Sequence, residues 1–424
     1  MLARLKSYFY FPIASYFCFF ALMRLRKWNP RIIVVTGSNG KTTLLHMLES
    51  QLREKAKFSH HANSSFGIPF DILDLHRVTL QKFEWLSLIL KAPLQVLRPL
   101  PKEKIYVVEA DADRPQEGKF LAELLKPEIV LWVSSSRTHS MNFDSLVSAG
   151  KFKTVEEAIA YEYGWFAVYC NSLLVIDGDC ALMTKQISRS KAKVLSLKKA
   201  QLFKSYSINK HGTQYNFKNK QYAFNYLLPE EVFLSIAMCE ETMDYLKLPM
   251  DRTFKKFQLP PGRGSLFEGV NGLTIIDSCY NANLSSMSVI LNMFQTFPAS
   301  KKWAVIGDML ELGEEEKEEH KKLAGMLVTL DAEHIIFLGP RVMKYTLPEF
   351  KKQSQKNIAV DAFENPKEVL DFILQHVQGG ETILFKGARF MEGIIEHLLK
   401  NKSDVALLAR REKIWEIRRK QWGL

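Results

Sequence analysis

The sequence predicts an α/β protein with two domains, each built on a mostly parallel sheet. Short apolar runs, most of them β-branched, alternate along the chain with stretches of helical spacing, which is typical of parallel sheets covered by helices. The runs that predict strands lie at residues 31–35, 104–108, 129–133, 173–176, 273–276, 303–306, 335–338 and 382–385. A cluster of breaking residues, Pro260-Pro261-Gly262-Arg263-Gly264, separates two such series. We therefore expect a central domain over 31–260 and a C-terminal Rossmann-like α/β domain over 261–424.

A glycine-flanked turn follows the first predicted strand. Residues 36–43 read Thr-Gly-Ser-Asn-Gly-Lys-Thr-Thr, and leucines at helical spacing follow at 44, 45, 48 and 52. The turn is therefore predicted at a helix N-terminus, where backbone N–H groups and the helix dipole favour an anion. This pattern indicates a P-loop ATPase domain that binds ATP with Mg²⁺, although a simple strand-to-helix turn containing Gly-Lys-Thr is the alternative. The predicted nucleotide-binding residues are Gly37, Ser38, Asn39, Gly40, Lys41, Thr42 and Thr43.

Each residue type in this turn has a physical role in the prediction. Glycines at 37 and 40 let the backbone approach phosphate oxygens, Lys41 would neutralise the β- and γ-phosphates, and the Thr42 hydroxyl would join the Mg²⁺ shell. The usual P-loop carries another glycine five residues before the second one, and Val35 occupies that position. The motif is therefore a shortened variant.

Polar residues follow two later strands. Glu109 ends the run 104–108, and residues 134–139, which finish with His139, follow the run 129–133. Ligands of open α/β sheets bind at the carboxyl ends of parallel strands. We therefore expect the turn, Glu109 and His139 to belong to one site.

Composition limits the class of protein. The chain has 424 residues, 47% hydrophobic and 25% charged, which is globular rather than disordered, and its formal net charge of +12 suits anionic partners. Five scattered cysteines indicate a reducing compartment without structural zinc. The tail 410–420 carries six Lys and Arg residues. We interpret it as a solvated helix rather than a nucleic-acid patch and expect no nucleic-acid partner.

The first 30 residues are aromatic, apolar and basic. Residues 7–23 are rich in Phe and Tyr, are flanked by Lys and Arg, and contain Pro12, and no acidic residue precedes Glu49. Seventeen residues are short for a spanning helix, which needs about 20. The pattern suggests an anchor lying on a membrane surface, and a helix packed on the ATPase domain or a partner is an equal alternative. A second apolar, basic stretch at 83–101 could lie on the same surface or be an ordinary core helix.

Later motifs give the chain a family resemblance. It resembles the Mur ligases over residues 31–400, most closely the branch that joins D-alanyl-D-alanine to UDP-N-acetylmuramoyl-tripeptide. The residues that carry the resemblance, in order, are 36–43, Asn63 with Gly67-Ile68-Pro69, Glu109, His139, Pro261-Gly262-Arg263, Tyr280-Asn281-Ala282-Asn283 with Ser286-Met287, 307–313 (Gly-Asp-Met-Leu-Glu-Leu-Gly) with His320, and Lys386-Gly387-Ala388-Arg389. The runs at 280–283 and 307–313 are the specific part, because the shortened P-loop alone also fits relatives of folylpolyglutamate synthase.

The resemblance implies an ATP-dependent ligase that forms an amide through an acyl phosphate, on a peptidoglycan precursor of the cell wall or a related peptide. It implies catalytic roles for Lys41, Glu109 and His139, and metal ligands at Thr42, Glu109 and His139. In the hinge and C-terminal domain it implies nucleotide contacts from Arg263, Asp277, Tyr280, Asn281 and Asn283. It implies substrate contacts from Asn63, Lys386 and Arg389. We expect small-molecule or peptide substrates, a monomer, and a cytoplasmic location at or near the inner face of the membrane.

Three departures from the family pattern limit these expectations. Only 30 residues precede the first predicted strand, so the family's N-terminal UDP-binding domain is not expected. Tyr163 stands where the family usually has a carbamylated lysine, with Glu162 beside it as a substitute carboxylate. Asp277-Ser278 replaces a common Asp-Asp pair. A polyglutamate-type ligase on a non-nucleotide acceptor and a catalytically silent ATP-binding scaffold therefore remain as alternatives.

Overall fold

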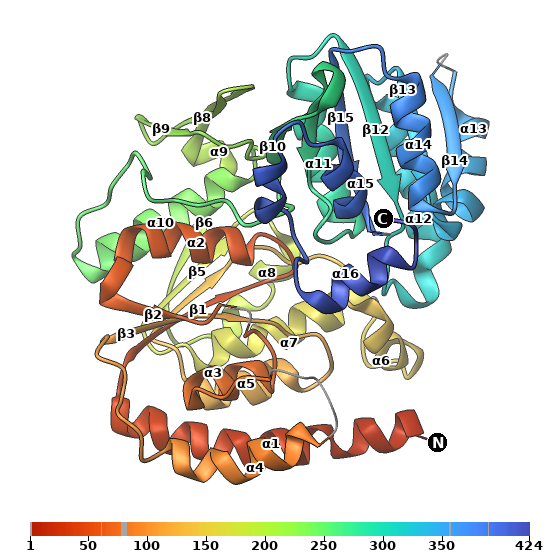
Figure 1. The fold of residues 1–424 in the computed structure, drawn as a ribbon. Helices are drawn as coiled ribbons and strands as arrows, with labels where there is room; N and C mark the ends of the chain where they lie inside the picture. Colours follow the sequence, from red (N-terminus) through yellow and green to blue (C-terminus); the bar gives the residue numbers. More distant parts are fainter. Residues whose placement is uncertain (1, 61, 78–82, 356–357, 389) are drawn as a thin grey trace. The chain divides into compact units, whose positions relative to one another are not determined.

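The computed structural model describes residues 2–60, 62–77, 83–355, 358–388 and 390–424 (Figure 1). Chain contacts divide it into two compact units. The first comprises residues 1–202, 234–251 and 255–257, and the second comprises 203–233, 252–254 and 258–424. The predicted fold class is confirmed: the first unit holds a parallel six-stranded sheet and the second a mostly parallel one. The predicted domain boundary at 260–261 stays a prediction, because the compact units assign residues 203–233 to the second unit.

The sheet of the first unit has the order β2-β3-β1-β4-β5-β6, and its described strand pairs are all parallel. Its strands are β1 (Arg31–Thr36), β2 (Ala56–Phe58), β3 (Ile105–Ala110), β4 (Ile129–Trp132), β5 (Leu173–Asp177) and β6 (Lys193–Leu197). Strands β3, β1 and β4 are adjacent, so the loops that follow them meet at one edge of the sheet. The apolar runs form strands because both faces are covered: the side chains of 32–35 are buried throughout.

Helices cover both faces of this sheet (Figure 1). Helix α2 (Lys41–Leu52) contacts β1, β2 and β3 on one face. The other face carries α3 (Gly67–Leu73), α5 (Glu117–Leu125) and α7 (Val155–Tyr169), and α1 (Leu2–Trp28) and α4 (Glu84–Gln95) pack outside them. The remaining helices of the unit are α6 (Asp144–Ser148), α8 (Ala181–Thr184), α9 (Lys199–Leu202) and α10 (Val232–Leu246).

Helix α1 extends beyond both ends of the apolar stretch 7–23 and continues through Pro12. Phe17, Ala21 and Leu25 lie on one of its faces, buried in the core of the first unit. The alternative expectation, a helix that packs on the ATPase domain, therefore describes this buried face of α1. None of the described helices combines the length and the apolarity that a bilayer crossing needs.

The second unit contains a mixed sheet of order β10-β11-β15-β12-β13-β14, in which only the pairing of β10 with β11 is antiparallel. Its strands are β10 (Ser265–Glu268), β11 (Thr274–Asp277), β12 (Lys301–Gly307), β13 (His334–Leu338), β14 (Ala359–Phe363) and β15 (Glu381–Lys386). Its helices are α11 (Leu284–Thr296), α12 (Glu316–Thr329), α13 (Leu347–Gln353), α14 (Pro366–His376), α15 (Met391–Leu398) and α16 (Lys413–Lys420).

A three-stranded antiparallel sheet that the sequence analysis did not single out completes the second unit. It is formed by β7 (Phe203–Asn209), β8 (Gly212–Phe217) and β9 (Lys220–Phe224). Ile208 and Leu227 join the same core cluster as Met287 of α11. This shared core explains why residues 203–233 group with the second unit.

Candidate functional site

The predicted phosphate loop lies between β1 and α2 and is fastened to the loop after β4. The backbone N–H of Ser38 donates to the carbonyl oxygen of Ser134 at 3.1 Å, and the N–H of Asn39 donates to Ser134 Oγ at 2.8 Å. Gly37 has φ +128°, and a Cβ there would lie 2.6 Å from the oxygen of Ser134. The glycine is therefore needed for this close approach as well as for its backbone conformation.

We expect Gly37→Ala to destabilise the protein by about 1–3 kcal/mol, since it combines backbone strain with a clash against a neighbouring backbone. Gly150→Ala is the matched control, because Gly150 also has positive φ (+69°) but a Cβ there meets nothing within 4 Å. Thermal unfolding of the two variants and the wild type checks the difference. Equal losses in the two variants would show that close packing on Ser134 is unimportant.

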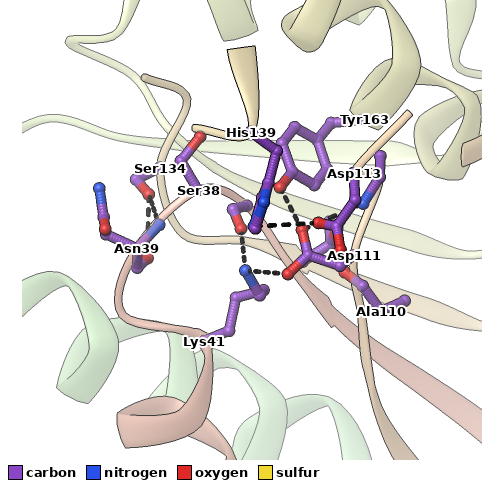
Figure 2. A network of polar contacts seen from close by, with 12 residues as sticks. Ser38, Asn39, Lys41, Ala110, Asp111, Asp113, Ser134, His139 and Tyr163 are labelled. Atoms are coloured by element: carbon purple, nitrogen blue, oxygen red, sulfur yellow. Dashed lines mark hydrogen bonds and ion pairs between the residues drawn. The ribbon is translucent and has the colours of Figure 1, made fainter. Parts of the chain in front are cut away.

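Lys41 is the first residue of α2 and turns back into the loop (Figure 2). Its Nζ donates to the carbonyl oxygen of Gly37 at 2.6 Å and lies 2.8 Å from Asp111 Oδ2. Burial by itself would lower the pKa of Lys41, but the negative charges of Asp111 and then Glu109 outweigh it and hold this pKa above its ordinary value. Lys41 therefore carries a fixed positive charge at the phosphate loop.

Acidic side chains and a histidine gather beside Lys41 (Figure 2). Asp111 and Asp113 follow β3, and His139 follows β4, with its Nε2 3.3 Å from Asp113 Oδ1. Burial and the charge of Asp111 raise the pKa of Asp113 to about 7. These three residues each offer a ligand atom, and the atoms all lie within 4.8 Å of one another. Carboxylate oxygens suit Mg²⁺, so the donor set fits a divalent cation.

Tyr163 of α7 lies against this group. Its hydroxyl donates to Asp111 Oδ1 at 2.6 Å, and the side chain is fully buried. Glu162 turns elsewhere: its carboxylate accepts from the backbone N–H of Gln116 at 2.9 Å. Tyr163, which the family resemblance matches to a carbamylated lysine, is therefore a neutral hydrogen-bond donor to Asp111.

We expect Tyr163→Phe to destabilise the protein by about 1–3 kcal/mol, because a buried carboxylate loses one of its donors. Tyr169→Phe on the same helix is the control, since the Tyr169 hydroxyl binds Glu123 at 2.8 Å at an exposed site. Chemical denaturation of both variants measures the difference. Two equally small losses would contradict a structural role for the Tyr163 hydroxyl.

The other predicted site residues of the first unit lie around the Asp111–Asp113–His139 group, but not all of them belong to it. Glu109 is within β3, and its backbone N–H donates to Ser59 Oγ at 3.0 Å. The carbonyl oxygen of Asn63 accepts from the N–H of Asp111 at 2.8 Å. Thr42 lies beside Lys41 in the first turn of α2. Of the predicted metal ligands Thr42, Glu109 and His139, His139 belongs to the Asp111–Asp113–His139 group, and His46, Glu49 and His60 form a second described group whose ligand atoms lie close together.

In the second unit, a tyrosine is flanked by two arginines. The guanidinium carbons of Arg263 and Arg410 lie 4.7 and 5.5 Å from the centre of the Tyr280 ring, which is 42% exposed. One guanidinium nitrogen of Arg410 also donates to the carbonyl oxygen of Tyr280 at 2.6 Å. Stacked guanidinium groups and an aromatic ring form a cationic surface that suits an anion or a flat ring.

Lys386, at the end of β15, is buried beside this surface. Its Nζ donates to the carbonyl oxygen of Asn281 at 2.6 Å. Burial, followed by the positive charge of Arg263, lowers the pKa of Lys386 to about 7. The amine therefore changes charge near neutral pH.

Three further predicted site residues of the second unit, Asp277, Asn281 and Asn283, make hydrogen bonds within the fold. Asp277 is fully buried, and its carboxylate accepts from the backbone N–H of Cys279 at 3.0 Å. Burial raises the pKa of Asp277. Asn281 Oδ1 accepts from the N–H of Ala282, and Asn283 caps α11 in a reciprocal pair with Ser286. Arg389 lies outside the described residues.

Sequence reasoning missed three residues of these groups. Asp111 and Asp113 follow Glu109 at alternate positions, and this acid-Ala-acid-Ala-acid run over 109–113 was a usable signal. Arg410 lies in the basic tail, 130 residues from Tyr280, and no local pattern marks it. Taken together, fold and site define a P-loop nucleotide-binding protein with an acidic group beside its lysine that could hold a cation.

Comparisons with known proteins identify the family within this class of nucleotide-binding proteins. The Mur ligase middle domain matches residues 35–233, and the Mur ligase glutamate ligase domain matches residues 262–389. The UDP-N-acetylmuramoyl-tripeptide--D-alanyl-D-alanine ligase of Borreliella burgdorferi is 24% identical over 389 residues, covering 86% of this chain and 74% of the relative. The chain belongs to the Mur ligase family, and it is an ATP-dependent acid–amino-acid ligase of the Mur type.

Solved structures share the fold. The MurF ligase from Thermotoga maritima in complex with ADP gives a TM-score of 0.72 at 22% identity, covering 91% of this chain and 83% of that one. FolC from E. coli, in complex with DHPP and ADP, gives 0.56 at 13% identity, covering 87% and 89%. Both likenesses concern the fold alone.

Proposed function

We propose that this ligase joins an amino acid or dipeptide to the carboxylate of a peptidoglycan precursor, with D-alanyl-D-alanine as the leading amine. The main support is that Lys41 and the Asp111–Asp113–His139 group lie at one sheet edge with the phosphate loop, in a chain that both Mur ligase domains match. The name of the Borreliella relative supports the choice of substrates.

The reaction forms an amide in two transfers. A carboxylate oxygen of the acceptor attacks the γ-phosphorus of ATP, and the bond to ADP breaks, giving an acyl phosphate. The amine nitrogen then attacks the acyl carbon, inorganic phosphate leaves with the bonding pair, and the nitrogen loses a proton. The first transfer brings two anions together, and negative charge develops on the acyl oxygen in the second, so electrostatic stabilisation dominates the catalysis.

Lys41 supplies the fixed cation of the first transfer. Its side chain is 7% exposed and is held between Gly37 and Asp111, so it needs little reorganisation to meet phosphate oxygens. The backbone of the loop, fastened by Ser134, orients the phosphates at the N-terminus of α2. The proposed nucleotide contacts are those of residues 37–43.

Mg²⁺ fits the acidic group beside Lys41. Asp111, Asp113 and His139 are the residues that would hold it, and Thr42 and Glu109 are the further candidates. When bound, the cation supplies positive charge to the phosphate and carboxylate oxygens. Burial and then the charge of Asp111 raise the pKa of Asp113 to about 7, and a bound cation would offset both effects.

Residues of the second unit are proposed for recognition. Tyr280 with Arg263 and Arg410 offers a cationic, aromatic surface, and Lys386 offers an ammonium group for a carboxylate. Asn63, Asn281, Asn283, Asp277 and Arg389 keep the roles that the family resemblance implies. A cytoplasmic, monomeric enzyme is the corresponding proposal for location and assembly.

Phosphate release tests the proposed reaction. Purified protein with Mg-ATP should release phosphate only when a muramyl tripeptide and D-alanyl-D-alanine are both present. Running the acceptor with and without its UDP group separates recognition of the nucleotide from recognition of the peptide. Silence with these pairs, together with turnover of other acid and amine pairs, would refute the substrate and keep the class.

A polyglutamate-type ligase is the second candidate, favoured by the fold shared with FolC. Replacing the dipeptide by glutamate in the same assay distinguishes it. A silent scaffold is the third, motivated by Tyr163 in place of the expected lysine. It predicts ADP binding without turnover on any tested acceptor.

A further inference from the structure

Exposed apolar side chains concentrate on two neighbouring helices of the first unit. Ten of the nineteen large hydrophobic side chains that are exposed in the described part of the chain lie on α1, α4 or the residues flanking α4. We define the apolar face by those members whose exposed fraction is at least half, Phe9 and Phe19 of α1 with Phe83, Leu86, Leu90, Leu94 and Leu97 of the α4 segment. Contiguous apolar surface of this kind marks an interaction site.

The fold does not need this face. Helix α1 buries Phe17 and Ala21 on its opposite side, and α4 buries Leu88 and Ala92. Residues 86, 90 and 94 of α4 follow helical spacing and form one outward stripe, and Leu97 in the turn after the helix is also exposed. Each helix therefore has a second apolar side beyond the one that packs on the core.

Helices α1 and α4 lie side by side (Figure 1), and polar contacts join them. The Tyr16 hydroxyl donates to the carbonyl oxygen of Ile89 at 2.8 Å. One guanidinium nitrogen of Arg24 donates to the carbonyl oxygen of Gln95, and another donates to that of Pro99 at 2.9 Å. These contacts hold α1 beside α4, and each helix buries one face in the core. The exposed faces of the two helices therefore lie on the same surface of the first unit.

The border of the apolar face is basic. Arg26 and Lys27 are exposed at the end of α1, Lys91 and Arg98 are exposed on the α4 segment, and no acidic residue occurs before Glu49. The acid at the start of α4, Glu84, lies 3.8 Å from Arg77. Apolar side chains bordered by Lys and Arg are the pattern of proteins that lie on anionic membranes.

A pocket of about 460 Å³ opens beside this stripe. Leu88 and Leu94 line its apolar part, and its charged lining consists of Lys91, Arg98, His76 and Asp74. The two cationic side chains, Lys91 and Arg98, outnumber the one carboxylate of the lining, Asp74, so the pocket has a positive character. Such a pocket suits a phosphate group attached to an apolar chain.

We propose that the apolar face docks this protein on the surface of an anionic phospholipid membrane, with a lipid headgroup phosphate in the pocket of Lys91 and Arg98. The inference is independent of the proposed substrate. A second copy of the chain is a poorer occupant, because a two-fold interface would bring the basic borders of both copies together. The geometry is that of a protein lying on the bilayer, with α1 and α4 parallel to its surface.

Vesicle sedimentation tests the apolar part of the proposal. The full chain should pellet with phosphatidylcholine vesicles that contain phosphatidylglycerol, and at least about tenfold less with phosphatidylcholine alone. The double variant Leu90→Asp/Leu94→Asp should lose at least about tenfold in affinity for the anionic vesicles. Leu374→Asp is the control, because Leu374 is also exposed on a helix, α14, but that helix belongs to the second unit. ADP affinity and thermal unfolding should stay unchanged in all variants.

The pocket is tested separately. We expect the double variant Lys91→Glu/Arg98→Glu to weaken binding to anionic vesicles about as much as added salt weakens the binding of the wild type. Lys351→Glu on α13 should leave the binding to these vesicles unchanged. Absence of binding to anionic vesicles, or equal binding by wild type and both double variants, would overturn the proposal. So would a dimer in light scattering that Leu90→Asp/Leu94→Asp dissociates, because the face would then belong to a second copy.

Discussion

Lys41→Met should reduce substrate-dependent phosphate release on the order of 10³-fold, since it removes the fixed cation from a site where anions react. It should also weaken ADP binding, which calorimetry measures without knowledge of the acceptor. Lys119→Met is the control, because Lys119 is an exposed lysine of the same unit. Wild-type ADP affinity and turnover in Lys41→Met would show that the glycine-flanked turn has no phosphate-binding role.

The same variant should unfold more easily, for a reason distinct from catalysis. Removing Lys41 leaves the buried Asp111 carboxylate without its ion-pair partner, and breaking a buried pair in this way costs roughly 3–5 kcal/mol. The Lys41 charge outweighs burial and holds the pKa of Asp111 below its ordinary value. Stability from this pair is therefore present above the ordinary pKa of an aspartate and is lost as the pH falls through the lowered one.

A double variant separates the two effects. In Lys41→Met/Asp111→Asn both charges are gone, so most of the lost stability should return while ADP affinity and turnover stay low. Thermal unfolding and ADP titration on the same samples provide the comparison. If the double variant recovered nucleotide binding together with stability, Lys41 would act only by supporting the fold.

Much of this fold was predictable because its strands are short apolar runs buried on both faces. The run at 129–133, for example, becomes β4 with every side chain buried. The sheet β7–β9 was missed because its strands are not continuous apolar runs: β7 has a single buried residue, and β7 and β8 carry many polar side chains. Its place in the second unit depends on contacts such as that of Ile208 with the α11 core, which have no local signal.

The site was predictable where a strand end carries a distinctive residue. The turn 36–43 and His139 were found because each lies in the segment that follows an apolar run, and the structure brings them to one sheet edge. The partner of Lys41 was not found, because several acids follow β3 and only the fold selects Asp111 among them. The exposed side of α1 was anticipated from its composition, whereas its alignment with α4 depends on contacts from Tyr16 and Arg24.

Lys386 should give the unfolding free energy a characteristic pH dependence. Burial, and then the charge of Arg263, lowers the pKa of Lys386 to about 7, whereas the unfolded chain keeps a lysine near 10.5. Between these values the unfolded state binds more protons than the folded state. The protein should therefore gain stability as the pH rises from about 7 to 10.5, by up to about 1.4 kcal/mol per pH unit.

Lys386→Met should remove this slope. The variant also loses the donor to the carbonyl oxygen of Asn281, but that loss is the same above and below the pKa and shifts the curve without tilting it. Lys351→Met, at an exposed position of α13, should keep the wild-type slope. Urea unfolding of the three proteins at several pH values in this window measures it. Parallel curves for wild type and Lys386→Met would contradict the lowered pKa.

The same titration bears on recognition. If Lys386 binds a substrate carboxylate, only its protonated form is effective, so substrate affinity should fall as the pH rises through about 7. Bound carboxylate would in turn favour the proton and raise the apparent pKa of this amine. Substrate titrations at pH values on both sides of 7, with Lys386→Met as the pH-independent reference, give the direction of the effect. If the substrate affinity of the wild type did not change with pH, Lys386 would serve only in the packing of the Asn281 loop.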